Sequence, residues 1–109
     1  MEKSSSVNQF PLTVYCDTLE EVQESIESPD FIRPILLSGC QRLLESDRRS
    51  LLIAEIFSFD TYATIKIYIR REEIEDVLIK TLHWFESREE YEECAECQRL
   101  IKILKHGNK

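Results

Sequence analysis

Glycine and proline are scarce in this chain, with 2 and 3 copies among 109 residues. Proteins made of many turns use more of both, because glycine supplies positive φ and proline a fixed φ. Two glycines also leave almost no material for a glycine-rich phosphate-binding loop. No apolar run approaches the ~18–20 residues of a membrane-spanning helix, and residues 1–11 contain no signal-peptide core. We therefore expect no membrane association and a cytoplasmic location.

Basic residues are outnumbered, with 14 Lys and Arg against 21 Asp and Glu and a formal net charge of −7. A protein that binds nucleic acid directly needs a dominant basic surface, so we expect none of that binding. The charge is also uneven, since residues 72–96 hold their many acids against only Lys80 and Arg88. Such an acidic block favours a protein partner with a basic surface.

The hydrophobic pattern predicts one α+β domain over residues 9–109, after a disordered tail at 1–8. Alternation predicts an edge strand, and a longer β-branched and aromatic stretch predicts a hairpin that turns at Asp60-Thr61. Apolar spacings of three and four predict helices. The strands are expected at 10–16 and within 51–70, and the helices at about 18–28, 31–45, 72–87 and 90–105. The order β-α-α-β-β-α-α indicates a small antiparallel sheet covered on one face by about four helices.

A two-residue turn would pair each hairpin residue i with residue 121 − i. One face is then wholly apolar, and Glu55 lies opposite Lys66 with complementary charge. The other face gathers Ile53, Phe57, Phe59, Tyr62 and Tyr68. The N-terminal strand or a helix could cover these rings. If they are uncovered, they mark an interface, and a homodimer is the simplest form of it.

Cys94 and Cys97 form a C-x-x-C motif, which has both metal-binding and redox uses. A closed zinc site needs a second ligand pair, and the remaining cysteines and histidines form none in the sequence. Both cysteines lie on the apolar stripe of a predicted helix. We therefore interpret them as small buried side chains and expect no metal and no cofactor, with metal or redox chemistry as the alternative.

Catalytic signals are weak. The two histidines, His83 and His106, have no motif-linked nucleophile, and the paired carboxylates lie in helical charge runs that are typical of a solvated face. We therefore expect that the protein is not an enzyme.

The segment Tyr91–Ile101 is similar to the second helix of UVR motifs, the helical hairpins through which nucleotide-excision-repair subunits and chaperone adaptors contact partners. The likeness rests on the Tyr91-Glu92-Glu93 start, the Cys94-Ala95 pair and Ile101. Cys97 departs from the usual Leu, and Gln98-Arg99 from the usual Arg-Asp pair. The resemblance implies contact with a protein through this helix.

Together these features predict a small acidic protein-interaction or regulatory module, one form of which is an inhibitor of a nucleic-acid-handling protein. Its surfaces would be the hairpin aromatics and the acidic residues Glu86, Glu89, Glu90 and Glu93. The alternative is a domain that binds an anion or nucleotide-like molecule. Its site would be an arginine cluster at the base of the hairpin, formed by Arg48, Arg49, Arg70 and Arg71.

Overall fold

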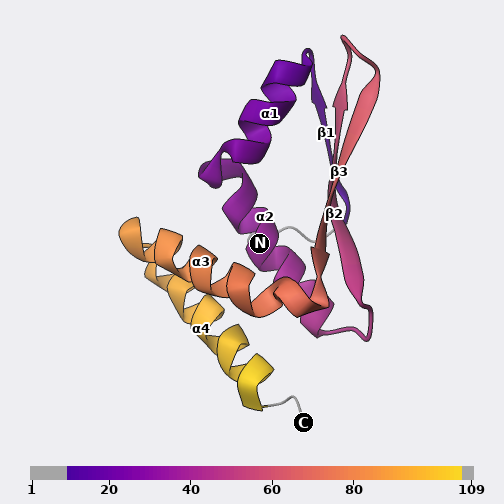
Figure 1. Cartoon of the computed structure of the whole chain (residues 1–109). Coiled ribbons are helices and arrows are strands. Elements are labelled where there is room, and N and C mark those ends of the chain that lie inside the picture. The colour runs from indigo at the N-terminus through magenta and orange to yellow at the C-terminus, as the bar shows by residue number, and fades with distance from the viewer. Residues whose placement is uncertain (1–9, 107–109) are drawn as a thin grey trace, which may run out of the picture.

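The computed structural model describes residues 10–106, which form a three-stranded sheet with helices on one side only (Figure 1). The elements are β1 (Leu12–Cys16), α1 (Leu19–Glu27), α2 (Pro29–Leu44), β2 (Ser50–Ser58), β3 (Ala63–Arg70), a 3-10 turn (Arg71–Glu73), α3 (Ile74–Ser87) and α4 (Tyr91–His106). The predicted α+β class and element order are confirmed. The expected tail at 1–8 lies outside the described residues.

The sheet has the order β1-β2-β3, so β2 is the central strand. The hairpin of β2 and β3 is antiparallel, but β1 runs parallel to β2, with Leu12 opposite Ala54 and Cys16 opposite Ser58. The expectation of a wholly antiparallel sheet is therefore corrected. A parallel pair needs a crossover connection, and α1 and α2 supply it.

The predicted hairpin register holds near the turn, where Glu55 lies opposite Lys66 and Phe57 opposite Thr64. The turn itself spans residues 59–62 rather than two residues, and Tyr62 takes a φ of 55° within it. Towards the base of the hairpin the register shifts at Ile53, between Leu52 and Ala54. An extra residue in one strand reverses the faces beyond it. Ile53 is therefore fully buried in the core, and its expected place among the outward aromatics is wrong.

Gly39 of α2 lies directly above this bulge. A Cβ atom at position 39 would lie 2.8 Å from Cγ2 of Ile53 and 2.8 Å from Cδ1 of Ile69. A glycine is needed here because only a residue without a side chain allows the helix to lie this close to β2 and β3. α2 begins earlier than expected, at Pro29, which fits the first turn of a helix, and it continues through Pro34.

The tip of the hairpin is joined to the start of α1. The carboxylate of Asp60 accepts hydrogen bonds from the backbone N–H of Leu19, at 3.2 and 3.3 Å, and from the hydroxyl of Ser58. Thr18 adds a local cap, because its hydroxyl accepts from the N–H of Glu21 at 3.1 Å. These bonds fix α1 against the sheet. The bond from Ser58, followed by those from the backbone, lowers the pKa of Asp60.

Candidate functional site

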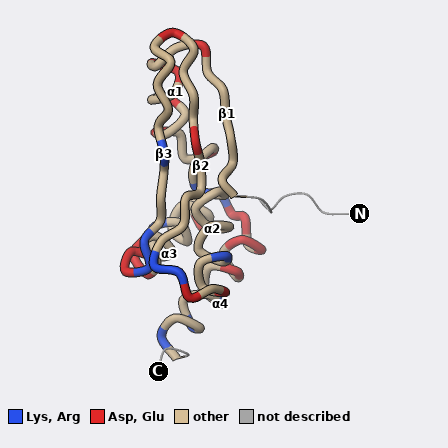
Figure 2. The backbone as a smooth tube through the Cα atoms, turned by 90° about the vertical axis from the view of Figure 1, so that its right-hand side faces the viewer, with Lys and Arg blue, Asp and Glu red and all other residues tan. Residues whose placement is uncertain are grey.

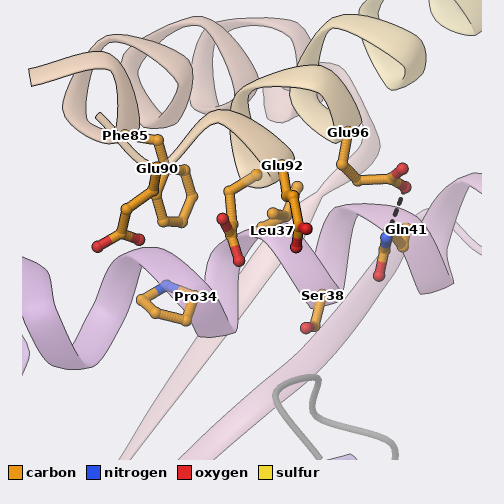
Figure 3. Close-up of a pocket in the computed structure, with 9 residues that line it drawn as sticks. Pro34, Leu37, Ser38, Gln41, Phe85, Glu90, Glu92 and Glu96 are labelled. Carbon is orange, nitrogen blue, oxygen red and sulfur yellow. Dashed lines mark hydrogen bonds between the residues drawn. The ribbon is translucent and has the colours of Figure 1, made fainter. Parts of the chain in front are cut away.

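A groove of about 300 Å³ lies between α2 and the start of α4, on the helical side of the molecule (Figure 3). Its apolar lining comes from Pro34 and Leu37 of α2 and from Phe85 of α3. Four glutamates line the rest of it together with two polar residues of α2; these are Glu90, Glu92, Glu93 and Glu96, with Ser38 and Gln41. The arrangement combines an apolar surface with a concentrated negative charge.

The turn between α3 and α4 places the glutamates at the groove. It is a Schellman motif, in which the N–H of Glu90 donates to the carbonyl of Phe85 at 3.1 Å and the N–H of Glu89 to that of Glu86 at 3.0 Å. Glu89 takes a φ of 60°, the left-handed conformation that this motif needs. α4 therefore starts immediately beside the end of α3. Its first turn holds Glu92 and Glu93, where the helix dipole favours acids.

Glu96 connects the two walls of the groove. Its Oε2 accepts a hydrogen bond from Nε2 of Gln41 at 2.6 Å, which links α4 to α2 (Figure 3). Arg99 donates to both carboxylate oxygens of Glu96, at 2.9 Å and 2.5 Å. The bonds from Arg99 are the main reason that the pKa of Glu96 is lowered, and the bond from Gln41 adds to the effect. The carboxylate of Glu96 therefore stays negatively charged at a lower pH than an ordinary glutamate does.

Arg88 is the one cation within the acidic run of residues 86–96, and acids already neutralise it. Its guanidinium pairs with Asp30 and Glu90, each at 3.2 Å, and lies over the ring of Trp84 at 4.9 Å from the centroid. These contacts hold the α3–α4 turn against the start of α2. Of the four glutamates that line the groove, Glu92 and Glu93 have no ion pair among the described residues and are left for an external cation.

The structure brings together only part of the predicted acidic set. Glu90 and Glu93 line the groove, whereas Glu86 and Glu89 are exposed outside its lining. The residues that α2 contributes are absent from the sequence-based prediction. The sequence pattern that could have indicated them is a second stripe on that helix, in which positions 34, 37, 38 and 41 recur at helical spacing. The stripe alone does not indicate which other helix faces it.

A second candidate surface is the helix-free face of the sheet. Phe57, Phe59 and Tyr62 cluster at the hairpin tip, with ring centroids 5.0 Å apart for the first two and 6.2 Å apart for Phe57 and Tyr62. Tyr15 of β1 joins them, 6.2 Å from Phe57 and 6.0 Å from Phe59. β1 therefore extends the aromatic face as an edge strand and does not cover it. Tyr68 lies apart from the cluster, further down β3 and opposite Leu52.

The arginine cluster at the hairpin base is largely committed to internal contacts. The guanidinium of Arg71 donates to the carbonyls of Arg48, Leu43 and Ser46, at 2.8, 2.8 and 2.5 Å. It thus satisfies the end of α2, where carbonyl groups lack helical partners. Arg70 pairs with Glu73 at 3.4 Å. Of these four arginines, only Arg48 and Arg49 have exposed guanidinium groups with no side-chain partner among residues 10–106. This weakens the anion-site alternative.

The thiols of the C-x-x-C motif point into the core. Cys94 and Cys97 are buried, as their helical stripe predicts, and Cys40 of α2 is buried near Cys97. Burial raises the pKa of Cys97 and of Cys40 to about 12, and it also raises that of Cys94. Thiols in this state are poor nucleophiles and poor metal ligands. Within residues 10–106, no group of three or more His, Cys, Asp and Glu side chains is arranged to hold a metal ion.

Comparison with known proteins adds no relative. No family model matches the chain, including the segment that is similar to UVR motifs, and neither a curated protein nor a solved structure matches it. None of the helices in residues 10–106 is both long and apolar enough to span a membrane. Any functional conclusion therefore depends on the surfaces described above.

Proposed function

We propose that this protein is a non-enzymatic protein-interaction module, located in the cytoplasm and acting as a homodimer, that binds a basic segment of a partner protein. The observation that carries the proposal is the groove between α2 and α4, which combines an apolar lining with four glutamates. A partner segment with alternating basic and apolar side chains would satisfy both parts of the site. Its cations would relieve the repulsion among Glu90, Glu92 and Glu93.

The chemistry of this groove suggests the class of partner. Proteins that handle nucleic acids carry Lys and Arg where they contact phosphate groups. An acidic groove can bind such a segment in place of nucleic acid, because it presents carboxylates of the same charge sign as phosphates. We therefore propose that the protein regulates a nucleic-acid-handling partner by occupying its basic surface.

The test measures binding of a fluorescein-labelled peptide of alternating arginine and leucine by fluorescence anisotropy. The double variant Glu92→Lys/Glu93→Lys should raise the Kd at least about tenfold, and added salt should weaken binding of the wild type. The matched control is Glu20→Lys/Glu24→Lys. It makes the same change in net charge on α1, outside the residues that line the groove.

The control decides between a site and a general charge effect. An unchanged Kd in the α1 variant, together with the loss in the α4 variant, supports the groove. Equal losses in the two variants would mean that the peptide responds only to net charge, and the proposed site would be abandoned. Far-UV circular dichroism of both variants checks that the helices are intact.

A further inference from the structure

The face of the sheet opposite the helices carries no other element of the described chain (Figure 2). Four aromatic side chains stand on it with large exposed fractions: Tyr15 65%, Phe59 50%, Tyr62 78% and Tyr68 53%. With ~200 Å² of surface per aromatic side chain, they expose on the order of 500 Å². A monomer rarely leaves a larger apolar patch to water, and one partner in a stable interface buries about 800 Å². The rings alone therefore supply more than half of such an interface.

The charges on this face are balanced, unlike those of the whole chain. Between the aromatic cluster and Tyr68, the outward charged residues are Glu55 of β2 and Lys66 of β3, which lie directly opposite each other. The chain as a whole has a net charge of −7, so two copies repel each other through most of their surfaces. Further down β3, the exposed Arg70 is paired with Glu73. Between the aromatic cluster and Tyr68, this face therefore carries one charge of each sign. It is thus the place where a second copy meets the least repulsion.

We infer that two copies of this chain pack together through their helix-free sheet faces. In a two-fold interface, residue i contacts residue j while j contacts i. An axis that runs along the strands between β2 and β3 places Glu55 of each copy against the second copy's Lys66. The same axis brings both hairpin tips to one end, so that Phe57, Phe59 and Tyr62 of the two copies pack against each other and Tyr15 of β1 flanks them. An axis across the strands at this level would instead place each glutamate against its own equivalent.

This arrangement is independent of the proposed groove. The two sheets would pack about 10 Å apart, as in an aligned sandwich, with the helices outside. Both acidic grooves lie on the helical side, so they stay open in the dimer. The two interactions respond oppositely to salt. Salt screens the repulsion between the acidic copies and strengthens the dimer, whereas it weakens the binding of a basic peptide to the groove.

The first experiment measures self-association of the full chain by sedimentation equilibrium. The wild type should form a dimer that becomes tighter with salt, and Tyr15→Ser/Tyr62→Asn should raise the dimer Kd at least about tenfold. Asparagine is chosen at position 62 because it tolerates the positive φ there. The control, Tyr91→Ser/Ile103→Ser, removes two exposed large side chains, 70% and 43% exposed, from α4. A monomeric wild type, or equal losses in both variants, would overturn the inference.

The second experiment tests the axis through charge swaps. Glu55→Lys or Lys66→Glu alone places like charges against each other in the dimer, and each variant should associate at least about tenfold more weakly than the wild type. An equimolar mixture of the two variants should regain association, because one copy then carries two lysines and the other two glutamates. Within each variant chain, residues 55 and 66 still carry like charges opposite each other. Recovery of association in the mixture therefore reports contact between the two copies. A mixture no tighter than the separate variants would overturn the proposed axis.

Discussion

At the scale of single residues, Gly39 occupies a position where the packing leaves no room for a side chain. Alanine is the better helix former, by about 1 kcal/mol, so Gly39→Ala would stabilise an ordinary exposed helix. Here the added methyl group would lie 2.8 Å from side-chain atoms of two buried isoleucines, Ile53 and Ile69. Overpacking of this kind costs about 1–3 kcal/mol, which over most of that range exceeds the gain in propensity. We therefore expect a net loss of up to about 2 kcal/mol in urea denaturation.

A double variant tests the cause of that loss. Ile69→Val removes Cδ1, one of the two atoms that the new methyl group would meet. Gly39→Ala/Ile69→Val should therefore be less destabilised than the sum of its single variants. Strict additivity would mean that the contact is not the cause.

At the scale of elements, the α3–α4 turn holds a residue that is unfavourable for its conformation. Glu89 takes a φ of 60° at the position of the Schellman motif that glycine usually fills. Since glycine carries no penalty in the left-handed region, Glu89→Gly should stabilise the protein by about 0.5–1 kcal/mol in urea denaturation.

The control for this turn is Gln98→Gly in the exposed interior of α4. A glycine at position 98 should destabilise the protein by about 1 kcal/mol, because the residue there has ordinary helical dihedral angles. If Glu89→Gly also destabilises the protein, side-chain contacts of Glu89 outweigh its backbone strain, and our account of the turn is wrong.

The elements also show what the sequence can and cannot predict. Each helix and strand was predictable because spacing in the sequence records which side is buried. The direction of β1 was not, since alternation looks the same in parallel and antiparallel pairs. The bulge at Ile53 was also hidden, because it accommodates the close approach of Gly39 from a different element. The register predicted for Glu55 and Lys66 survives because it depends only on the strand segment next to the turn.

The same limit applies to the candidate sites. Clustering of Phe57, Phe59 and Tyr62 follows from their nearness along the hairpin, and the acidic run is visible in the sequence. The groove requires α2 to lie beside α4, a contact that no local pattern specifies. Arg71 illustrates the limit most clearly. Its sequence neighbours suggest an anion site, whereas its guanidinium binds carbonyl groups at the end of α2.

At the scale of the whole molecule, two carboxylates join elements that are distant in the sequence. Asp60 joins the hairpin tip to α1, and Glu96 joins α4 to α2. The pKa of each is held below its ordinary value, 3.8 for the aspartate and 4.5 for the glutamate, mainly by the bonds from Ser58 and Arg99 respectively. The unfolded chain therefore binds protons at these groups at a higher pH than the folded chain does. Their stabilisation is complete above the ordinary values and is lost as the pH falls through the lowered ones.

We therefore expect acid to remove the advantage of the wild type over Asp60→Asn and over Glu96→Gln. At pH 7 the wild type should be the more stable protein in each comparison, and the gap should close between about pH 5 and pH 2. Comparing each variant with the wild type at every pH cancels the general effect of the other acids, which lose their mutual repulsion over the same range. The control is Asp47→Asn, whose carboxylate has no hydrogen-bond or ion-pair partner within residues 10–106. Urea denaturation at intervals of pH measures the gaps. A gap for Asp60→Asn that stays constant to pH 2 would show that its carboxylate contributes no charge-dependent stability where the hairpin meets α1.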